Sequence, residues 1–585
     1  APRDRDRHAE SDHALNGRRA AGLVKRDGAT LAALLGLALA VRVWGIHYGL
    51  PWLFYFHDEP QIVLRALRFG TGDLNPHFFL WPATPLLYLA FVSYAGWFVI
   101  GRVAGAFTGA SDFAAAYFRD PSGFYLIVRT HSVAFGVWGV WLAQRLGRAA
   151  YGDAVGWAAA VGLALNAWHA HYSHFAHPVT AMSAFTLLGL WAAVRIADGG
   201  GRRDLVIAAV ALGAGTACQY HAGLLAVPIA VAVLLRAARA PGEAGRWLMS
   251  GAAVALGGVA LFLALSPFVV LDSAAFRADL AWIAAKTEGS LSGQARSPII
   301  GLLEFVRTCV IPSLGMPLAI AAAVGTLWAL VRRTSSDLVL LAFAAGYLAL
   351  ASRAATLNDR YAIPLVVPAV TFAARAISEM LSRAWPARAG GRIRMRWAPT
   401  LAIGILGLPV TLELIETDFS MTRDDTRIEA LRWFEREVPA DARVVADMLK
   451  FWNTATAPIA ENPARIRERL AEIDRGMSGA GHGAAYREYF QYRLTHPHRP
   501  GYWVASTDMG FSARSLADYR ADGFQWAMVS GEVVDAMRAR AAPADSSGPA
   551  FYRALAREAT PIASFEPQRW QRRGPRIVVY RLSPR

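Results

Sequence analysis

The chain has 585 residues, of which 55% are hydrophobic and 18% are charged, and its mean hydropathy is +0.29. This composition is too apolar for an ordinary soluble multidomain protein, so it predicts a membrane protein. The formal net charge of +16 does not argue for nucleic-acid binding, because much of the excess lies in short Arg-rich stretches between apolar runs, where membrane orientation explains it. Cys218 and Cys309 stand in or beside apolar runs, so neither a disulfide framework nor a CxxC metal site is expected.

Apolar runs of about 20 residues, long enough to cross a hydrocarbon core of roughly 30 Å, recur from Leu31 to about Leu414 and then stop. We therefore expect a basic cytoplasmic N-terminus over 1–28, a multi-span membrane domain over 29–415 and a soluble domain over 416–585. No small-residue cleavage site follows the first apolar run, which predicts a retained anchor rather than a signal peptide.

Short loops can be sorted by their basic residues, because cytoplasmic loops are enriched in Lys and Arg. Arginines fall in alternate loops of the membrane part, whereas the loops around 169–177 and 219–221 have no Lys or Arg. The pattern predicts about eleven spans. It also predicts a cytoplasmic N-terminus and a C-terminal domain outside the cytoplasmic (inner) membrane.

One segment, 80–105, is apolar enough to span, but counting it as a span would place the basic cluster of 383–396 outside. We therefore expect 80–105 to be a helix pair or re-entrant element at the outer surface, within a first outer loop over 49–123. A full span is the alternative.

Two adjacent carboxylates, Asp58 and Glu59, stand where the chain leaves the first apolar run, in the sequence FHDEP. Carboxylates near hydrocarbon are costly and usually serve an ion, a proton or a substrate. The alternative is a hydrated interfacial loop without chemistry.

Four segments in chain order resemble the C-type glycosyltransferase superfamily: Asp58-Glu59, the run GDLNPHFFLWP at 72–82 with PLLY at 85–88, the segment that opens at Arg129, and NDRYAIPLVVPAV at 358–370. Within it the chain is similar to bacterial phospholipid-carrier-dependent enzymes related to protein O-mannosyltransferases and lipid A aminoarabinose transferases. The resemblance covers most of residues 29–415. It implies an enzyme that takes a sugar from a polyprenyl-phosphate carrier at the outer face of the membrane and transfers it to a protein, lipid or polysaccharide acceptor.

The resemblance also implies roles for particular residues. Asp58 matches the catalytic aspartate, which implies a general base that takes the proton of the acceptor hydroxyl, with inversion at the anomeric carbon. Glu59 would orient the acceptor. Arg129 and Arg360 stand at predicted outer ends of spans, where arginine is disfavoured unless it has a task, and are the expected ligands of the carrier phosphate. Their alternative role is to anchor helix ends to lipid headgroups. Further candidates are Arg65 for the phosphate and His57, His77 and Lys286 for the substrate or for a lid formed by the loop 266–311.

The predicted outer loop around 169–177 carries four histidines. The spacing of His171, His174 and His177 puts them near one face of a helix, where they could hold a divalent cation together with Asp58. The alternative is that amphipathic rings suit the membrane interface. No other cofactor is expected.

Two positions depart from the family pattern. Relatives often have an acidic residue where this chain has Val179, so a second catalytic carboxylate is not expected there. The aminoarabinose transferases carry a lysine before their helix-start prolines, whereas Leu80-Trp81 precede Pro82 in this chain, which disfavours that substrate.

The C-terminal segment predicts an α/β fold. Ile428, Leu431 and Phe434 recur at helical spacing, and strand-like runs follow at Arg443–Ala446, Trp526–Ser530 and Arg576–Leu582. No catalytic motif stands out, so acceptor binding or structural support is the expected role.

Two rival functions stay open for the whole chain. One is a transporter or flippase of a lipid-linked sugar, although the sequence has no paired half-repeats with Gly/Pro-broken spans. The other is an oligosaccharide transferase or ligase, which would move a whole glycan.

Overall fold

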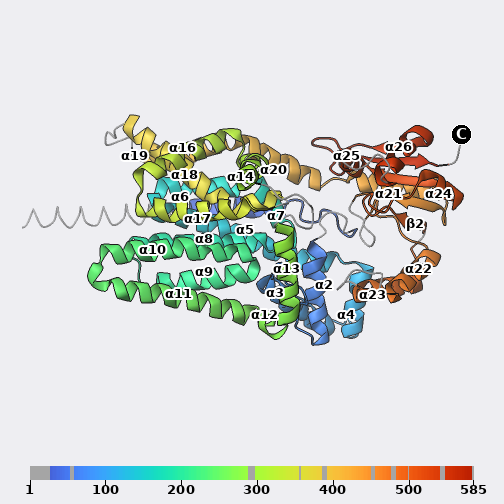
Figure 1. Cartoon of the computed structure of the whole chain (residues 1–585), viewed down its shortest axis with the longest axis horizontal. Coiled ribbons are helices and arrows are strands. Elements are labelled where there is room, and N and C mark those ends of the chain that lie inside the picture. The colour runs from blue at the N-terminus through green and yellow to red at the C-terminus, as the bar shows by residue number, and fades with distance from the viewer. Residues whose placement is uncertain are drawn as a thin grey trace, which may run out of the picture.

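The computed structural model describes residues 27–52, 58–287, 297–354, 357–384, 392–448, 455–475, 483–498, 500–539 and 547–582. A long helical bundle makes up most of the molecule, and a smaller mixed domain lies at one end of it (Figure 1). We call this end of the bundle the domain-side end and the opposite end the far end. Most of the expected basic N-terminus and His57 lie outside the described residues.

The bundle consists of apolar helices that run between its two ends (Figure 1). They are the helix 27–43, α5 (Ser122–Tyr151), α6 (Asp153–Ala164), α8 (Val179–Ala197), α9 (Arg202–Cys218), α10 (Ala226–Arg239), α11 (Ala244–Leu265), α16 (Met316–Arg332), α17 (Ser335–Ala351), α18 (Ile363–Ala384) and α19 (Arg392–Leu406). Small residues on α6 and α8 let both helices pack closely against α5, and one continuous core runs through the bundle.

By length and composition, six helices of the described chain could cross a membrane, or up to eight if each of two bent pairs is one span. The expected number of about eleven is larger, partly because α6 and α17 are apolar but short. The chain is a polytopic α-helical membrane protein with a C-terminal α/β domain, as the composition predicted.

Further elements, most of them short, cover the domain-side end. They are α2 (Glu59–Arg68), η1 (Phe69–Thr71), α3 (Thr84–Val103), α4 (Ala110–Arg119), α7 (Ala167–Ser173), η2 (Tyr220–Leu225), α12 (Phe268–Leu271), α13 (Ser273–Thr287), α14 (Pro298–Phe305), η4 (Val306–Val310), α15 (Ile311–Leu314), η5 (Asp359–Ala362) and α20 (Leu408–Met421). Figure 1 shows α2 and α13 running across the direction of the bundle helices, between the bundle and the C-terminal domain. At the far end the only such element in the described chain is η3 (Pro241–Glu243).

The helix α3 lies across the domain-side end, although it is long and apolar enough to span. At its start the hydroxyl of Thr84 lies 2.6 Å from that of Ser266, just after α11. Ten residues on, the hydroxyl of Tyr94 donates to the carbonyl of Phe124, at the start of α5, at 2.9 Å. Because α5 begins and α11 ends at the same end of the bundle, α3 stays there instead of crossing. These contacts favour the surface element expected in this segment over a full span.

The C-terminal domain contains a five-stranded sheet with strand order β2-β1-β3-β5-β4. The strands β1 (Arg443–Ala446), β2 (Trp503–Ser506) and β3 (Trp526–Ser530) are parallel, whereas β5 (Ile577–Arg581) pairs antiparallel with β3 and with β4 (Thr560–Phe565). The helices of this domain are α21 (Thr426–Glu437), α22 (Pro463–Asp474), α23 (Gly483–Thr495), α24 (Leu516–Ala521), α25 (Gly531–Ala539) and α26 (Ser547–Glu558). The predicted α/β fold is confirmed. The α/β domain begins after α20, so it starts later in the chain than the expected boundary at 416.

The C-terminal domain is tied to the bundle by direct contacts. The Tyr48 hydroxyl donates to the carboxylate of Asp425, which in turn caps α21. The ring of Phe118 on α4 stacks on Tyr492 on α23, with 5.4 Å between their centroids. The two parts are therefore joined at the turn that leads to Asp58 and at the helices that cover the bundle.

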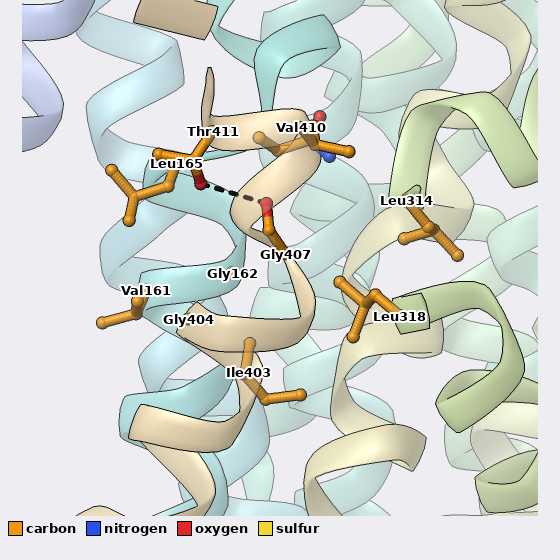
Figure 2. Close-up of a pocket in the computed structure, with 11 residues that line it drawn as sticks. Val161, Gly162, Leu165, Leu314, Leu318, Ile403, Gly404, Gly407, Val410 and Thr411 are labelled. Carbon is orange, nitrogen blue, oxygen red and sulfur yellow. Dashed lines mark hydrogen bonds between the residues drawn. The ribbon is translucent and has the colours of Figure 1, made fainter. Parts of the chain in front are cut away.

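A small cavity lies at the bend between α19 and α20 (Figure 2). Its volume is about 10 Å³, and Gly404, Gly407, Leu314 and Leu318 are among its lining residues. The Thr411 hydroxyl closes the bend by donating to the carbonyl of Gly407 at 3.1 Å. This space is about that of one water molecule, so it can hold neither a sugar nor a lipid, and the site lies elsewhere.

Candidate active site

The two adjacent carboxylates stand at the start of α2, on the domain-side end of the bundle. Asp58 is the residue before the helix, Glu59 is its first residue, and Pro60 follows in the first turn. Proline suits this position because its missing N–H has no partner within the helix. The Asp58 side chain makes no capping hydrogen bond to its own helix, so its carboxylate is directed to other parts of the chain.

Asp58 faces two residues that are distant in sequence. The Nη1 of Arg360, on η5, lies 3.2 Å from Asp58 Oδ2, and the Nε2 of His177 lies 3.8 Å from the same oxygen. The side chains of Asp58 and Arg360 are 13% and 17% exposed, whereas that of His177 is fully buried. The buried His177 thus contacts Asp58 from the protein interior, while Asp58 and Arg360 keep some exposed surface.

The backbone near His177 selects its tautomer. The N–H of Val179 donates to Nδ1 of His177 at 3.2 Å. In the neutral ring the proton is therefore on Nε2, which is the nitrogen that faces Asp58. The ring also lies against Trp81, with 5.5 Å between the ring centroids. His177 can therefore orient the Asp58 carboxylate.

Glu59 has a different environment from its neighbour. Its carboxylate is buried and accepts two hydrogen bonds from Arg129 on α5, from Nε at 2.8 Å and from Nη2 at 2.7 Å. The N–H of Ala176 donates to the same carboxylate at 2.8 Å. Arg129 also donates to the carbonyls of Ile46 and Tyr48, at 2.6 and 2.9 Å.

This buried pair differs from the roles predicted for its members. The Arg129 side chain is 2% exposed and that of Glu59 is 4% exposed, so in this structure neither faces a space that could hold a phosphate or an acceptor. The pair instead joins the end of the first helix, α2, α5 and the loop before α8. Its position suggests that it fixes the backbone on which Asp58 stands.

Arg65 and His77 lie in contacts within the covering elements. Arg65 donates from Nε to the carbonyl of Pro76 at 3.0 Å, its guanidinium lies over the ring of Phe78, and burial lowers its pKa to about 10. His77 lies 2.9 Å from Asp73 and 3.5 Å from Asp272 and is half exposed. These contacts attach the segment 72–80 to α2 and to Asp272, between α12 and α13. Lys286 is on α13, but its side chain lies outside the described residues, as does the Gly-rich part of the predicted lid.

The predicted metal site at His171, His174 and His177 is not formed. The helix α7 ends at Ser173, so helical spacing does not extend over all three histidines. His177 faces Asp58, whereas His174 contacts the carbonyl of Trp44 at 2.9 Å, and burial lowers the pKa of His174 to about 4. Among the described residues, no group of three or more His, Cys, Asp or Glu side chains could hold a metal ion.

Two contacts of this site were not predicted. The role of His177 as a partner of Asp58 was missed, although the histidine had been singled out. The Tyr172 hydroxyl donates to Asp359, whose carboxylate also accepts the N–H of Arg360 at 2.7 Å. This contact attaches η5, and with it Arg360, to α7. Asp359 stands directly before Arg360 in the sequence, and a carboxylate next to a candidate arginine could have suggested that it helps to position this arginine.

A family model described as dolichyl-phosphate-mannose-protein mannosyltransferase matches residues 125–271. The match covers α5 to α12 and agrees with the resemblance to C-type membrane glycosyltransferases. A search of curated proteins finds no relative that matches this chain.

Several solved structures are similar in outline. The apo structure of ArnT from Cupriavidus metallidurans has 12% identity and a TM-score of 0.47, with 95% of this chain and 98% of that chain covered. The same protein bound to undecaprenyl phosphate has 11% identity and a TM-score of 0.45, with the same coverage. The Archaeoglobus fulgidus oligosaccharyltransferase in complex with Zn and sulfate has 13% identity and a TM-score of 0.44, with 90% of this chain and 71% of that chain covered.

The buried pair predicts a large loss of stability when one partner is neutralised. Glu59→Gln leaves the Arg129 charge buried without its counter-ion, which typically costs about 3–5 kcal/mol. The matched control is Asp112→Asn, which breaks the exposed ion pair with Arg119 and should cost at most about 1 kcal/mol. Thermal unfolding of the purified protein in detergent measures both. Equal unfolding temperatures for the two variants would contradict a structural role of the pair.

Proposed function

We propose that the chain is an inverting glycosyltransferase that takes a sugar from a polyprenyl-phosphate carrier and transfers it to an acceptor hydroxyl, with Asp58 as the general base. The observation that carries this proposal is that Asp58, Arg360 and His177 meet at one end of a membrane-embedded bundle. The family model matched by residues 125–271 is named for enzymes that use a lipid-linked sugar, which supports a donor of this class.

Asp58 is suited to be the base because it is the carboxylate that is not enclosed. Its neighbour Glu59 is held by Arg129 and by the backbone, whereas Asp58 has exposed surface. In the reaction the acceptor hydroxyl gives its proton to Asp58 as its oxygen forms a bond to the anomeric carbon. The bond from that carbon to the phosphate oxygen breaks on the opposite face, and the carrier phosphate leaves with the bonding electrons. One displacement inverts the anomeric configuration.

Arg360 can contact both the general base, Asp58, and the leaving phosphate. Its guanidinium contacts Asp58 and has exposed surface at the same end of the bundle. A guanidinium binds phosphate with parallel donors and stays charged at the interface, so Arg360 would stabilise the charge that develops on the leaving phosphate. His177, which faces Asp58 from the buried side, would keep the carboxylate aimed at the acceptor. No step of this mechanism requires a metal ion.

The orientation in the membrane is part of the proposal. Exposed arginines such as Arg148, Arg203 and Arg246 lie at the far end of the bundle. Since basic loops stay in the cytoplasm, the far end would be cytoplasmic. The Asp58 site and the C-terminal domain would then face outward from the inner membrane.

The change Asp58→Asn tests the base directly. It keeps the size of the side chain but removes the proton acceptor, and general-base assistance is typically worth about 10²–10⁴-fold in rate. Turnover of a lipid-linked sugar donor should fall by that factor while donor binding is retained. The matched control Asp73→Asn changes an exposed carboxylate of the same covering region and should keep near wild-type turnover. Folded Asp58→Asn protein with a wild-type rate would refute the assignment, and a transporter would become the better proposal if the same preparation moved the lipid-linked sugar across the bilayer.

Arg360→Gln tests the contact with the leaving group. Loss of a charge-assisted hydrogen bond typically costs about 1.5–3 kcal/mol, so kcat/KM for the donor should fall about tenfold or more. Arg353→Gln is the matched control, because Arg353 is an exposed arginine at the end of α17, at the same end of the bundle. An unchanged kcat/KM in Arg360→Gln would reduce this residue to a lipid anchor.

Cysteine labelling tests the orientation. Ser547→Cys lies in the C-terminal domain and Gly242→Cys at the far end, and both positions are exposed, whereas the native Cys218 and Cys309 are buried. An impermeant maleimide should label Ser547→Cys in intact cells and Gly242→Cys only after lysis. The reverse pattern would overturn the orientation.

A further inference from the structure

A second polar site lies at the far end of the bundle, remote from Asp58. It is a cavity of about 270 Å³ between the ends of α5, α8 and α9. Its lining combines arginines with tryptophans: Trp141, Arg145, Trp191, Arg195, Arg203, Asp204 and Ile207.

The charge of this cavity is positive. Arg195 is paired with Asp204, with 2.5 Å between Nε and Oδ1, and the buried Asp204 also caps α9. Among the described residues, neither Arg145 nor Arg203 has a carboxylate within ion-pair distance, and the buried Nε of Arg145 has no hydrogen-bond partner. The cavity thus offers two guanidinium groups to an anion.

The tryptophans hold the arginines in place. The Arg145 guanidinium lies 5.1 Å from the ring centroid of Trp141, and that of Arg195 lies 5.5 Å from the centroid of Trp191. The two indoles meet edge to face, with 6.2 Å between their centroids. Stacking on aromatic faces pre-orients a guanidinium and so lowers the entropy cost of binding a phosphate.

An apolar groove lies next to this cavity, with Trp141 between them. It has a volume of about 480 Å³ between the helix 27–43 and α5, and Trp141 lines both spaces. Its other lining residues are apolar apart from one threonine: Leu35, Leu39, Val43, Thr130, Val133, Ala134, Val137 and Trp138. Leu39 and Val43 are 48% and 45% exposed, so the groove opens to the lipid side of the bundle.

The groove has the length of a lipid chain. From Trp141 to Thr130 the helix α5 rises about 16 Å at 1.5 Å per residue, which is close to half of the roughly 30 Å hydrocarbon core. A molecule with an anionic head in the cavity and an apolar tail in the groove would therefore match the length of one acyl chain.

We propose that this cavity and groove bind an anionic membrane phospholipid, with its phosphate on Arg145 and Arg203 and one acyl chain between the helix 27–43 and α5. Basic pockets between membrane helices are suited to anionic headgroups. The site is independent of the proposed transfer reaction, because it lies at the other end of the bundle from Asp58. The bound lipid would brace the first helix, whose end leads into the Asp58 turn.

Native mass spectrometry of the purified, delipidated protein tests the proposal. With added phosphatidylglycerol we expect one lipid to stay bound with an affinity at least about tenfold higher than that of phosphatidylcholine. The double change Arg145→Gln and Arg203→Gln should remove this preference. The matched control is Arg148→Gln with Arg202→Gln, which removes the same charge from exposed positions of the far end that do not line the cavity.

A second variant tests the groove without changing the charge. Ala134→Phe should fill the groove and weaken phosphatidylglycerol binding, and Leu39→Trp does the same from the facing helix if the first variant does not fold. Equal binding of the two lipids, retention of phosphatidylglycerol by the arginine double variant, or full competition by inorganic phosphate would each overturn the proposal. The last result would mean that the cavity takes a phosphate without a lipid chain.

Discussion

The structure of the site depends on one buried ion pair, between Glu59 and Arg129. A buried arginine is tolerated in a low-dielectric interior when a counter-ion neutralises its charge and acceptors bind its N–H donors. Here Glu59 supplies the charge and two acceptors, and the carbonyls of Ile46 and Tyr48 supply the others. Because these partners come from three parts of the chain, the pair holds the first helix, α2 and α5 in one arrangement.

Adjacent carboxylates acquire different tasks from this arrangement. A helix start turns consecutive side chains in different directions, so when Glu59 points inward to Arg129, Asp58 points toward Arg360 and His177. The inward residue gains a rigid position and loses access to substrate. The outward residue keeps exposed surface and a fixed position, and the proposed role of general base would need both.

The same turn connects the site to the C-terminal domain. Tyr48 accepts a hydrogen bond from Arg129 through its carbonyl and donates one through its hydroxyl to Asp425. Asp425 caps α21, and the next residue, Thr426, donates its N–H to the carbonyl of Arg573. The contacts therefore run from the α/β domain to the backbone next to Asp58, which favours structural support as a role of this domain.

The arginines of the two ends of the bundle have different surroundings. At the domain-side end, Arg129 and Arg360 each contact a carboxylate. At the far end, Arg145 stacks on an indole and, among the described residues, has no carboxylate partner. Charge counting along the sequence treats all of these residues alike. The difference between an ion pair and an open cationic site depends on which helices are neighbours.

Hydropathy and charge along the chain predicted the broad architecture but not the number of spans. They predicted a helical membrane part and an α/β domain with three of its five strands, because each of these depends on local composition and periodicity. The strands β2 and β4 were missed, since β2 follows Pro500-Gly501 closely and β4 contains Pro561. The motifs also singled out Asp58, Glu59, Arg129, His177 and Arg360 before their contacts were known.

Only the tertiary structure decided what these residues contact. Helical spacing placed three histidines on one face, but α7 ends before His174, and among the described residues no group of three such ligands forms. The resemblance to known glycosyltransferases gave Glu59 an acceptor-orienting role, but a partner 70 residues away takes Glu59 into the interior. Arg360 meets Asp58 from the other end of the membrane part. Such pairings depend on which buried charges must be neutralised across the fold, and local periodicity has no information about that.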